Sequence, residues 1–198
     1  MLRVRTRWRG FTLVELMVTL AVFVILVSMA APSFVRMVAS DRMTTQTNEL
    51  ITGLNSAKSE AIRRGQPVTL RARDDTNPND FHRGWFTFTD ADADGAAGTP
   101  ATEAEGTVLR DTMALTGATT VRRVTRTGTA PNFTYPAATS ALTGRQYVTF
   151  TPRGGTTAGA ASFFRICDST YPNVPGRIVQ VSLVGRVSLE SNNENCAL

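Results

Sequence analysis

One apolar run near the N-terminus limits what this chain can fold into more than any other feature. Residues 11–34 are apolar apart from four hydroxyl side chains, Pro32 and one carboxylate, Glu15. The ten residues before the run carry four arginines and no acid. A helix needs about 20 apolar residues to cross a membrane, and an ionisable side chain inside such a helix is costly and points to a function. We therefore predict a membrane segment in which Glu15 has a specific partner.

The bond between Gly10 and Phe11 offers a source for that partner. If the chain is cut there, Phe11 supplies a new α-amine and Glu15 becomes the fifth residue of the product. A carboxylate in an apolar environment needs a cation beside it. The amine of a neighbouring copy would be such a cation.

The residues around this bond resemble the class III signal of type IV prepilins and type II secretion pseudopilins. The match rests on Gly10, Phe11, the Thr12-Leu13-Val14 stretch, Glu15 and Pro32. The resemblance implies that a prepilin peptidase cleaves after Gly10 and N-methylates Phe11. It also implies that Glu15 pairs with a subunit amine during assembly and that Pro32 breaks the membrane helix. The implied partners are other pilins or pseudopilins in a hetero-oligomeric filament.

An ordinary secretory signal peptide is an alternative interpretation of the same region. Leu16–Val27 would be its apolar core, and Ser28-Met29-Ala30 has the small residues of a cleavage site. Cleavage there would release a soluble β-rich domain that begins near Ala31. This interpretation gives Glu15 no role. An uncleaved membrane anchor is a third interpretation.

A second resemblance lies further along the chain. Gly84–Asp90 is an aromatic and β-branched stretch that leads into an Asp- and Gly-rich segment, and Val108-Leu109-Arg110 follows. Both stretches are similar to the GspH/FimT branch of pseudopilins. The resemblance implies an α+β, type IV pilin-like fold in which a long N-terminal helix packs on an antiparallel β-sheet.

The hydrophobic pattern predicts elements that suit this fold. Beyond Pro32, six residues recur at helical spacing, and Gly65 and Pro67 follow as stop signals; the six are Met43, Thr47, Leu50, Leu54, Ala57 and Ala61. We predict one helix from about Phe11 to Arg64, kinked or broken at Pro32.

The chain after Gly65 reads as strands and turns without further helices. The expected strands are residues 68–73, 85–89, 107–110, 120–125, 146–151, 162–167, 177–183 and 186–190. Val184-Gly185 is expected to form a tight hairpin, and residues 91–106 and 127–145 read as loops. The chain then divides into a leader (1–10), a transmembrane and assembly segment (11–34) and a periplasmic domain (35–198).

The composition is that of a folded chain, with 42% hydrophobic and 19% charged residues. The 21 basic and 16 acidic residues give a net charge of +5. Without the four leader arginines the count is 17 against 16, so net charge gives no argument for a nucleic-acid partner. The distribution is uneven, however: residues 74–111 hold nine acids and two arginines, and residues 112–189 hold eight arginines and one acid.

The arginine-rich half has two interpretations. One is a basic surface for an anionic partner such as DNA, and the other is pairing with the acidic half of the same chain. The candidate contacts are Arg122, Arg123, Arg126, Arg165, Arg177 and Arg186. Relatives implicated in DNA uptake carry a Gly-Arg-x-Arg element, but here Ser188 stands in place of the second arginine.

Two further patterns concern metals and cysteines. Asp90, Asp92 and Asp94 resemble the first half of a calcium loop, and a solvated acidic loop is the alternative. No other cofactor is expected. Cys167 and Cys196 are the only cysteines, and an even count in an exported protein predicts a disulfide.

Enzyme motifs are lacking, and the chain has one histidine, His82. We predict a minor pseudopilin or minor pilin, without enzymatic activity, that assembles as a tip or initiation subunit of a type II secretion pseudopilus or a type IV pilus. A DNA-binding minor pilin and a secreted β-domain are the alternatives. The expected location is the bacterial inner membrane, with one span and a periplasmic C-terminal domain.

Overall fold

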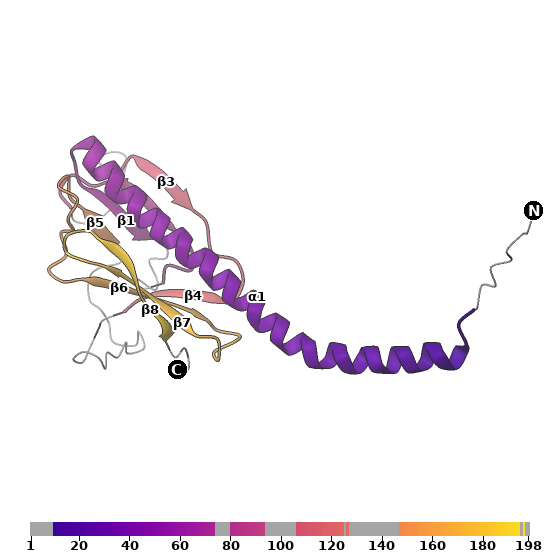
Figure 1. The fold of residues 1–198 in the computed structure, drawn as a ribbon. Helices are drawn as coiled ribbons and strands as arrows, with labels where there is room; N and C mark the ends of the chain where they lie inside the picture. Colours follow the sequence, from indigo (N-terminus) through magenta and orange to yellow (C-terminus); the bar gives the residue numbers. More distant parts are fainter. Residues whose placement is uncertain are drawn as a thin grey trace, which may run out of the picture. The chain divides into compact units, whose positions relative to one another are not determined.

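The fold contains one long helix and eight strands (Figure 1). It is a computed structural model that describes residues 10–73, 80–93, 106–124, 126, 147–194 and 196. The chain divides after Val38 into two compact units, Met1–Val38 and Ala39–Leu198. Helix α1, Leu13–Arg64, contributes residues to both units.

Local side-chain chemistry sets the ends of α1. The Glu15 backbone N–H donates to Thr12 Oγ1 at 3.2 Å, so Thr12 is the N-cap and the helix begins at Leu13, two residues after the expected Phe11. Gly65 ends the helix with φ of 68°. The helix continues through Pro32, so a break is absent there, and a kink at this residue stays a prediction. Proline removes one backbone donor, and the bonds of the neighbouring turns keep the helix intact.

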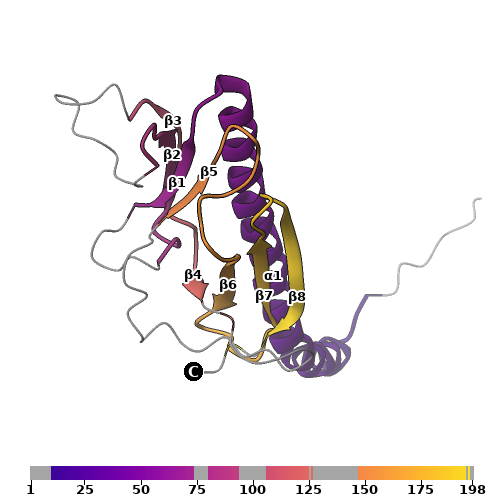
Figure 2. The same cartoon turned by 90° about the vertical axis from the view of Figure 1, so that its left-hand side faces the viewer.

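The eight strands form two antiparallel sheets of four strands each. Their bounds are β1 Val68–Ala72, β2 Trp85–Thr89, β3 Val108–Thr112, β4 Thr119–Val124, β5 Tyr147–Phe150, β6 Ser162–Asp168, β7 Gly176–Val181 and β8 Val187–Glu194. The strand orders are β3-β2-β1-β5 and β4-β6-β7-β8. Figure 2 shows both sheets beside the C-terminal half of α1. The predicted α+β class is confirmed, with two sheets where one was expected. Residues 94–105 of the loop expected at 91–106, and the whole loop expected at 127–145, lie outside the described residues.

The C-terminal half of α1 packs against both sheets. All six helix residues that recur at helical spacing are buried. Their strand partners include Leu70 from the first sheet and Phe164 and Val179 from the second, all within one hydrophobic cluster. The helix therefore joins the two sheets by burying apolar surface from each.

Gly53 is a place where α1 comes close to β2. A Cβ at this residue would lie 2.8 Å from Trp85 Nε1, and Trp85 is fully buried. Alanine at an ordinary helical glycine stabilises by about 0.5–1 kcal/mol, whereas overpacking costs about 1–3 kcal/mol. We expect Gly53→Ala to lower the free energy of unfolding by about 1–2 kcal/mol, measured by urea titration.

The matched control is Asn55→Ala, two residues along on the exposed side of the same helix. This change should leave the unfolding midpoint unchanged or raise it slightly, because alanine favours the helix and meets no neighbour. A stabilised Gly53→Ala variant would contradict the close packing of Trp85.

A disulfide joins Cys167 in β6 to Cys196 beyond β8. Both cysteines are buried. Gly176 of β7 lies beside the bridge, where a Cβ would be 2.4 Å from Cys196 Sγ and 2.9 Å from Cys167 Sγ. The bridge therefore passes close over β7, and a glycine provides the room.

Candidate functional site

The segment before α1 is accessible. Gly10 and Phe11 lie outside the helix, and the Phe11 side chain is 79% exposed. A peptidase needs a reachable backbone, and both residues of this bond are exposed and lie outside α1. Cleavage between Gly10 and Phe11 and methylation of Phe11 stay predictions.

The N-terminal half of α1 is an apolar helix with no protein cover in its own unit. Every residue from Leu13 to Val38 is exposed, and an 18-residue window has a mean hydropathy of 2.5. By length and composition this helix is able to cross a membrane. Its hydroxyl groups suit such surroundings: Thr19 Oγ1 donates to the Leu16 carbonyl at 2.9 Å, and Ser28 Oγ donates to the Ile25 carbonyl at 2.7 Å.

Glu15 is the single ionisable side chain between Phe11 and Val35. It lies in the first turn of α1, where the helix dipole favours a negative charge. In the described part of the chain no side chain forms an ion pair with it. A carboxylate in this position is therefore available to a group from another molecule.

Two of the candidate arginines, Arg122 and Arg123, bind identified groups of their own chain. Arg122 Nε donates to Asp80 Oδ1 at 2.9 Å. Arg123 donates to the Tyr147 carbonyl at 3.1 Å and to Ser162 Oγ at 2.7 Å. The Arg122–Asp80 contact joins the arginine-rich half to the acidic half, whereas the Arg123 contacts stay within the arginine-rich half.

Arg126 behaves in the same way. Its Nη1 donates to Glu190 Oε1 at 2.8 Å, and its guanidinium lies 5.5 Å from the centre of the Phe163 ring. The Arg126 guanidinium therefore has a carboxylate partner in Glu190 and a cation–π contact with the Phe163 ring, and both residues belong to the second sheet.

The strand register separates the candidate arginines further. Arg122 lies opposite Arg165 on one face of the second sheet, and Arg177 lies opposite Ile166, a core residue, on the other. Arg186 belongs to the turn between β7 and β8. Successive side chains of a strand point to opposite faces. The six arginines therefore do not lie on one face of the second sheet, which disfavours the interpretation of a single basic surface.

Asp90, the first residue of the proposed calcium loop, has a structural role in the fold. Asp90 is fully buried and accepts a hydrogen bond from Thr69 Oγ1 at 2.5 Å. Asp92 is described, whereas Asp94 lies outside the described residues. Within the described ranges no three His, Cys, Asp or Glu side chains gather as a metal site would require. A calcium site stays a prediction that the described residues do not support.

Two parts of the chain match models of known protein families. Residues 46–185 match the family model for the type II transport protein GspH, and residues 9–31 match the model for the prokaryotic N-terminal methylation motif. No curated protein matches the sequence.

Solved structures resemble the fold. One crystal form of the type IV minor pilin FimU of Pseudomonas aeruginosa has a TM-score of 0.54 at 20% identity, covering 79% of this chain and 96% of that one. The minor pseudopilin EpsH of the Vibrio cholerae type 2 secretion system has a TM-score of 0.46 at 13% identity, covering 76% of this chain and 97% of that one. The first likeness supports the fold.

Proposed function

Because the chain belongs to the type II transport protein GspH family and so is a minor pseudopilin or minor pilin, we propose that it enters a filament through the N-terminal half of α1. The observation that carries this proposal is the exposed apolar half of α1 with one carboxylate, Glu15, which lies within the matched methylation motif of residues 9–31. In the assembled state the Glu15 carboxylate pairs with the α-amine of a neighbouring subunit.

The proposed route begins at the membrane. The chain is inserted in the bacterial inner membrane by its apolar helix, with its second unit in the periplasm. A prepilin peptidase cleaves between Gly10 and Phe11 and methylates the new amine. Removal of the leader takes away four arginines and creates the amine that Glu15 of a neighbour requires.

The processing step has a direct test. We expect the membrane-extracted product to begin at Phe11 and to carry one added methyl group, as measured by intact mass and N-terminal sequencing. In cells without a prepilin peptidase the leader should remain attached. A soluble product that begins near Ala31 would overturn the proposal and leave a secreted β-domain.

The filament that we favour is a type II secretion pseudopilus, because the matched family model is that of a type II transport protein. In that filament we place the chain at the tip or at initiation. A type IV pilus is the second candidate. Loss of secretion, with pili unaffected, in a strain that lacks the chain would support the first filament, and the reverse phenotype would support the second.

DNA capture is the weaker alternative, because Arg122, Arg123 and Arg126 are held by groups of the same chain. Salt-sensitive retention of DNA by the purified protein would revive this alternative. No retention at low salt would leave assembly as the role of the chain.

A further inference from the structure

Three segments far apart in the sequence meet where α1 ends. They are the last turns of the helix, the connection between β5 and β6, and the turn between β7 and β8. Lys58 Nζ donates to the Gly185 carbonyl at 3.0 Å, and the Thr156 N–H donates to the Leu183 carbonyl at 2.9 Å. These two hydrogen bonds hold the β7–β8 turn against the end of α1 and against the β5–β6 connection.

The β7–β8 turn has little freedom to move. The Ser182 N–H donates to the Arg186 carbonyl at 2.9 Å, and the Gly185 N–H donates to the Ser182 carbonyl at 2.8 Å. Gly185 has φ of 69°, and a Cβ there would lie 1.9 Å from the Gly154 carbonyl oxygen. These contacts hold the backbone of the turn in one conformation, so the side chains that it carries have fixed positions of attachment.

The turn presents aliphatic side chains to solvent. Val184 is 74% exposed and Leu183 is 50% exposed, and Ile62 of α1 is 52% exposed. Tight turns usually carry Gly, Asn, Asp or Ser, which tolerate solvent and unusual backbone angles. Leu183 and Val184 at this rigid turn bury little of their apolar surface within the fold. That surface is therefore accessible to a binding partner.

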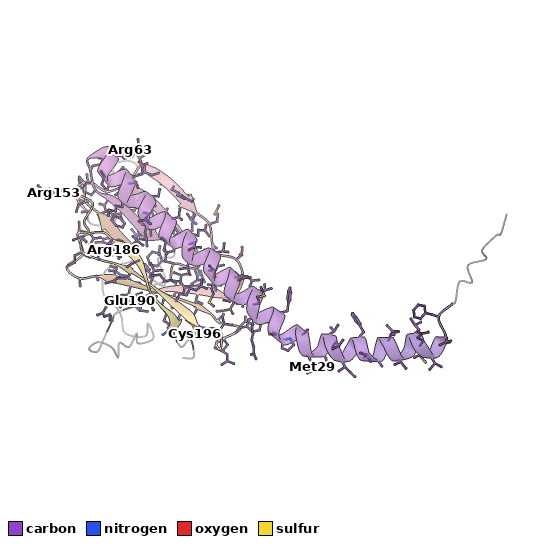
Figure 3. All side chains as sticks on the ribbon, viewed as in Figure 1. Met29, Arg63, Arg153, Arg186, Glu190 and Cys196 are labelled. Atoms are coloured by element: carbon purple, nitrogen blue, oxygen red, sulfur yellow. A yellow bond between two sulfur atoms is a disulfide. The ribbon has the colours of Figure 1, made fainter. Side chains whose placement is uncertain are left out.

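The surroundings of these aliphatic residues are basic. Arg63, Arg153 and Arg186 lie at this end of the second unit, as Figure 3 shows. The nearby carboxylate of Glu60 already binds Arg63 at 2.6 Å and Arg64 at 2.7 Å. Hydrogen bonds from Arg64 and Arg63 hold the pKa of Glu60 below its usual range, so this carboxylate stays charged and committed to them. In the described part of the chain Arg153 and Arg186 have no carboxylate partner.

We propose that this surface, the end patch, docks a neighbouring filament subunit through a protein face that places carboxylates around an apolar depression. The end patch consists of Ile62, Arg63, Arg153, Leu183, Val184 and Arg186. Protein interfaces combine an apolar centre with a polar rim, and arginine is enriched in them. A nucleic-acid backbone would use the arginines but would leave the three aliphatic side chains in water, so a protein partner fits better. This proposal rests on the proposed function, since it requires a filament.

The test uses a photo-crosslinking amino acid at position 184 of the full chain, in cells that express the complete set of filament subunits. We expect a crosslink to a peptide of another chain with an N-terminal methylation motif, and we expect Asp or Glu within that peptide. Reversing the charges by Arg153→Glu with Arg186→Glu should lower the crosslink yield about tenfold, because like charges then face each other.

Two controls make this result specific. The pair Arg42→Glu and Arg110→Glu reverses the charge of two exposed arginines outside the end patch and should leave the yield at position 184 unchanged. A crosslinker at Met113, which is as exposed as Val184, should give a yield that does not respond to the Arg153 and Arg186 reversals.

Several outcomes would overturn the end-patch proposal. They are a crosslink to nucleic acid or phospholipid, a crosslinked peptide without carboxylates, and a yield that ignores the charge reversal. The N-terminus of the chain is measured in the same samples. A mature chain that begins at Phe11 but gives no crosslink overturns the end patch alone. A chain that keeps its leader overturns the proposed function and, with it, the docking surface that depends on it.

Discussion

Replacing Glu15 with alanine is expected to lower the amount of the chain recovered in filaments by at least tenfold. Glu15 is the only ionisable side chain in the apolar stretch from Phe11 to Val35. Breaking a buried ion pair by removing one partner costs about 3–5 kcal/mol, because the other charge stays buried and unpaired. A cost of about 1.4 kcal/mol already corresponds to a factor of ten.

The measurement compares the chain in sheared filaments with the chain left in the membrane. The membrane pool of Glu15→Ala should stay at the level of the parent, because Glu15 belongs to the first unit and not to the second. Thr19→Val is the matched control, since it changes a polar side chain in the same helix but removes no charge. Recovery of Glu15→Ala in filaments at the level of the parent would contradict the assembly role.

A purely structural role of Glu15 is separable from the assembly role. Thr12 and Glu15 have the spacing of a capping box, in which glutamate and glutamine both serve at the later position. Glu15→Gln therefore keeps the capping chemistry and removes only the charge. If the charge matters, the glutamine variant should be as poorly incorporated as the alanine variant. If glutamine restores incorporation, helix capping explains the alanine result.

Much of the secondary structure was predictable because periodicity is a local property. All eight expected strands are present, and α1 ends at Arg64 as expected. The buried positions of α1 also follow its helical spacing. The bounds of β8 differ most, because the polar residues after Glu190 give no strand pattern. Ser191 and Glu194 nevertheless pair with Ile178 and Gly176 of β7 through backbone groups, which do not depend on side-chain polarity.

The arrangement of the strands was less predictable from the sequence. β5 pairs with β1 across about 80 residues, and β4 joins a different sheet from β3 although the two are neighbours in sequence.

Contacts of the candidate site between residues far apart in the sequence were equally hard to predict. The contact between Arg122 and Asp80 joins residues 42 positions apart, and composition gives only the sum of such charges. The end patch was missed because Leu183 reads as the end of a strand, whereas β7 ends at Val181.

Removing the disulfide is expected to lower the Tm of the second unit by roughly 6–16 °C. The bridge closes a separation of 29 residues. On the chain-entropy model such a loop contributes about 3–4 kcal/mol. The measurement is thermal unfolding of Cys167→Ala with Cys196→Ala, a pair that leaves no free thiol. A reductant should bring the parent to the same Tm and should not affect the double variant.

The geometry of the second sheet explains why this bridge matters. β8 is an edge strand that pairs with β7 alone, so backbone bonds hold it from one side. The disulfide reaches across β7 and ties the chain after β8 to β6, a strand to which β8 itself is not bonded. Each single cysteine variant should therefore be about as unstable as the double variant, because one crosslink is lost in all three. Additive losses from the two single variants would show that the cysteines stabilise the fold separately, through packing.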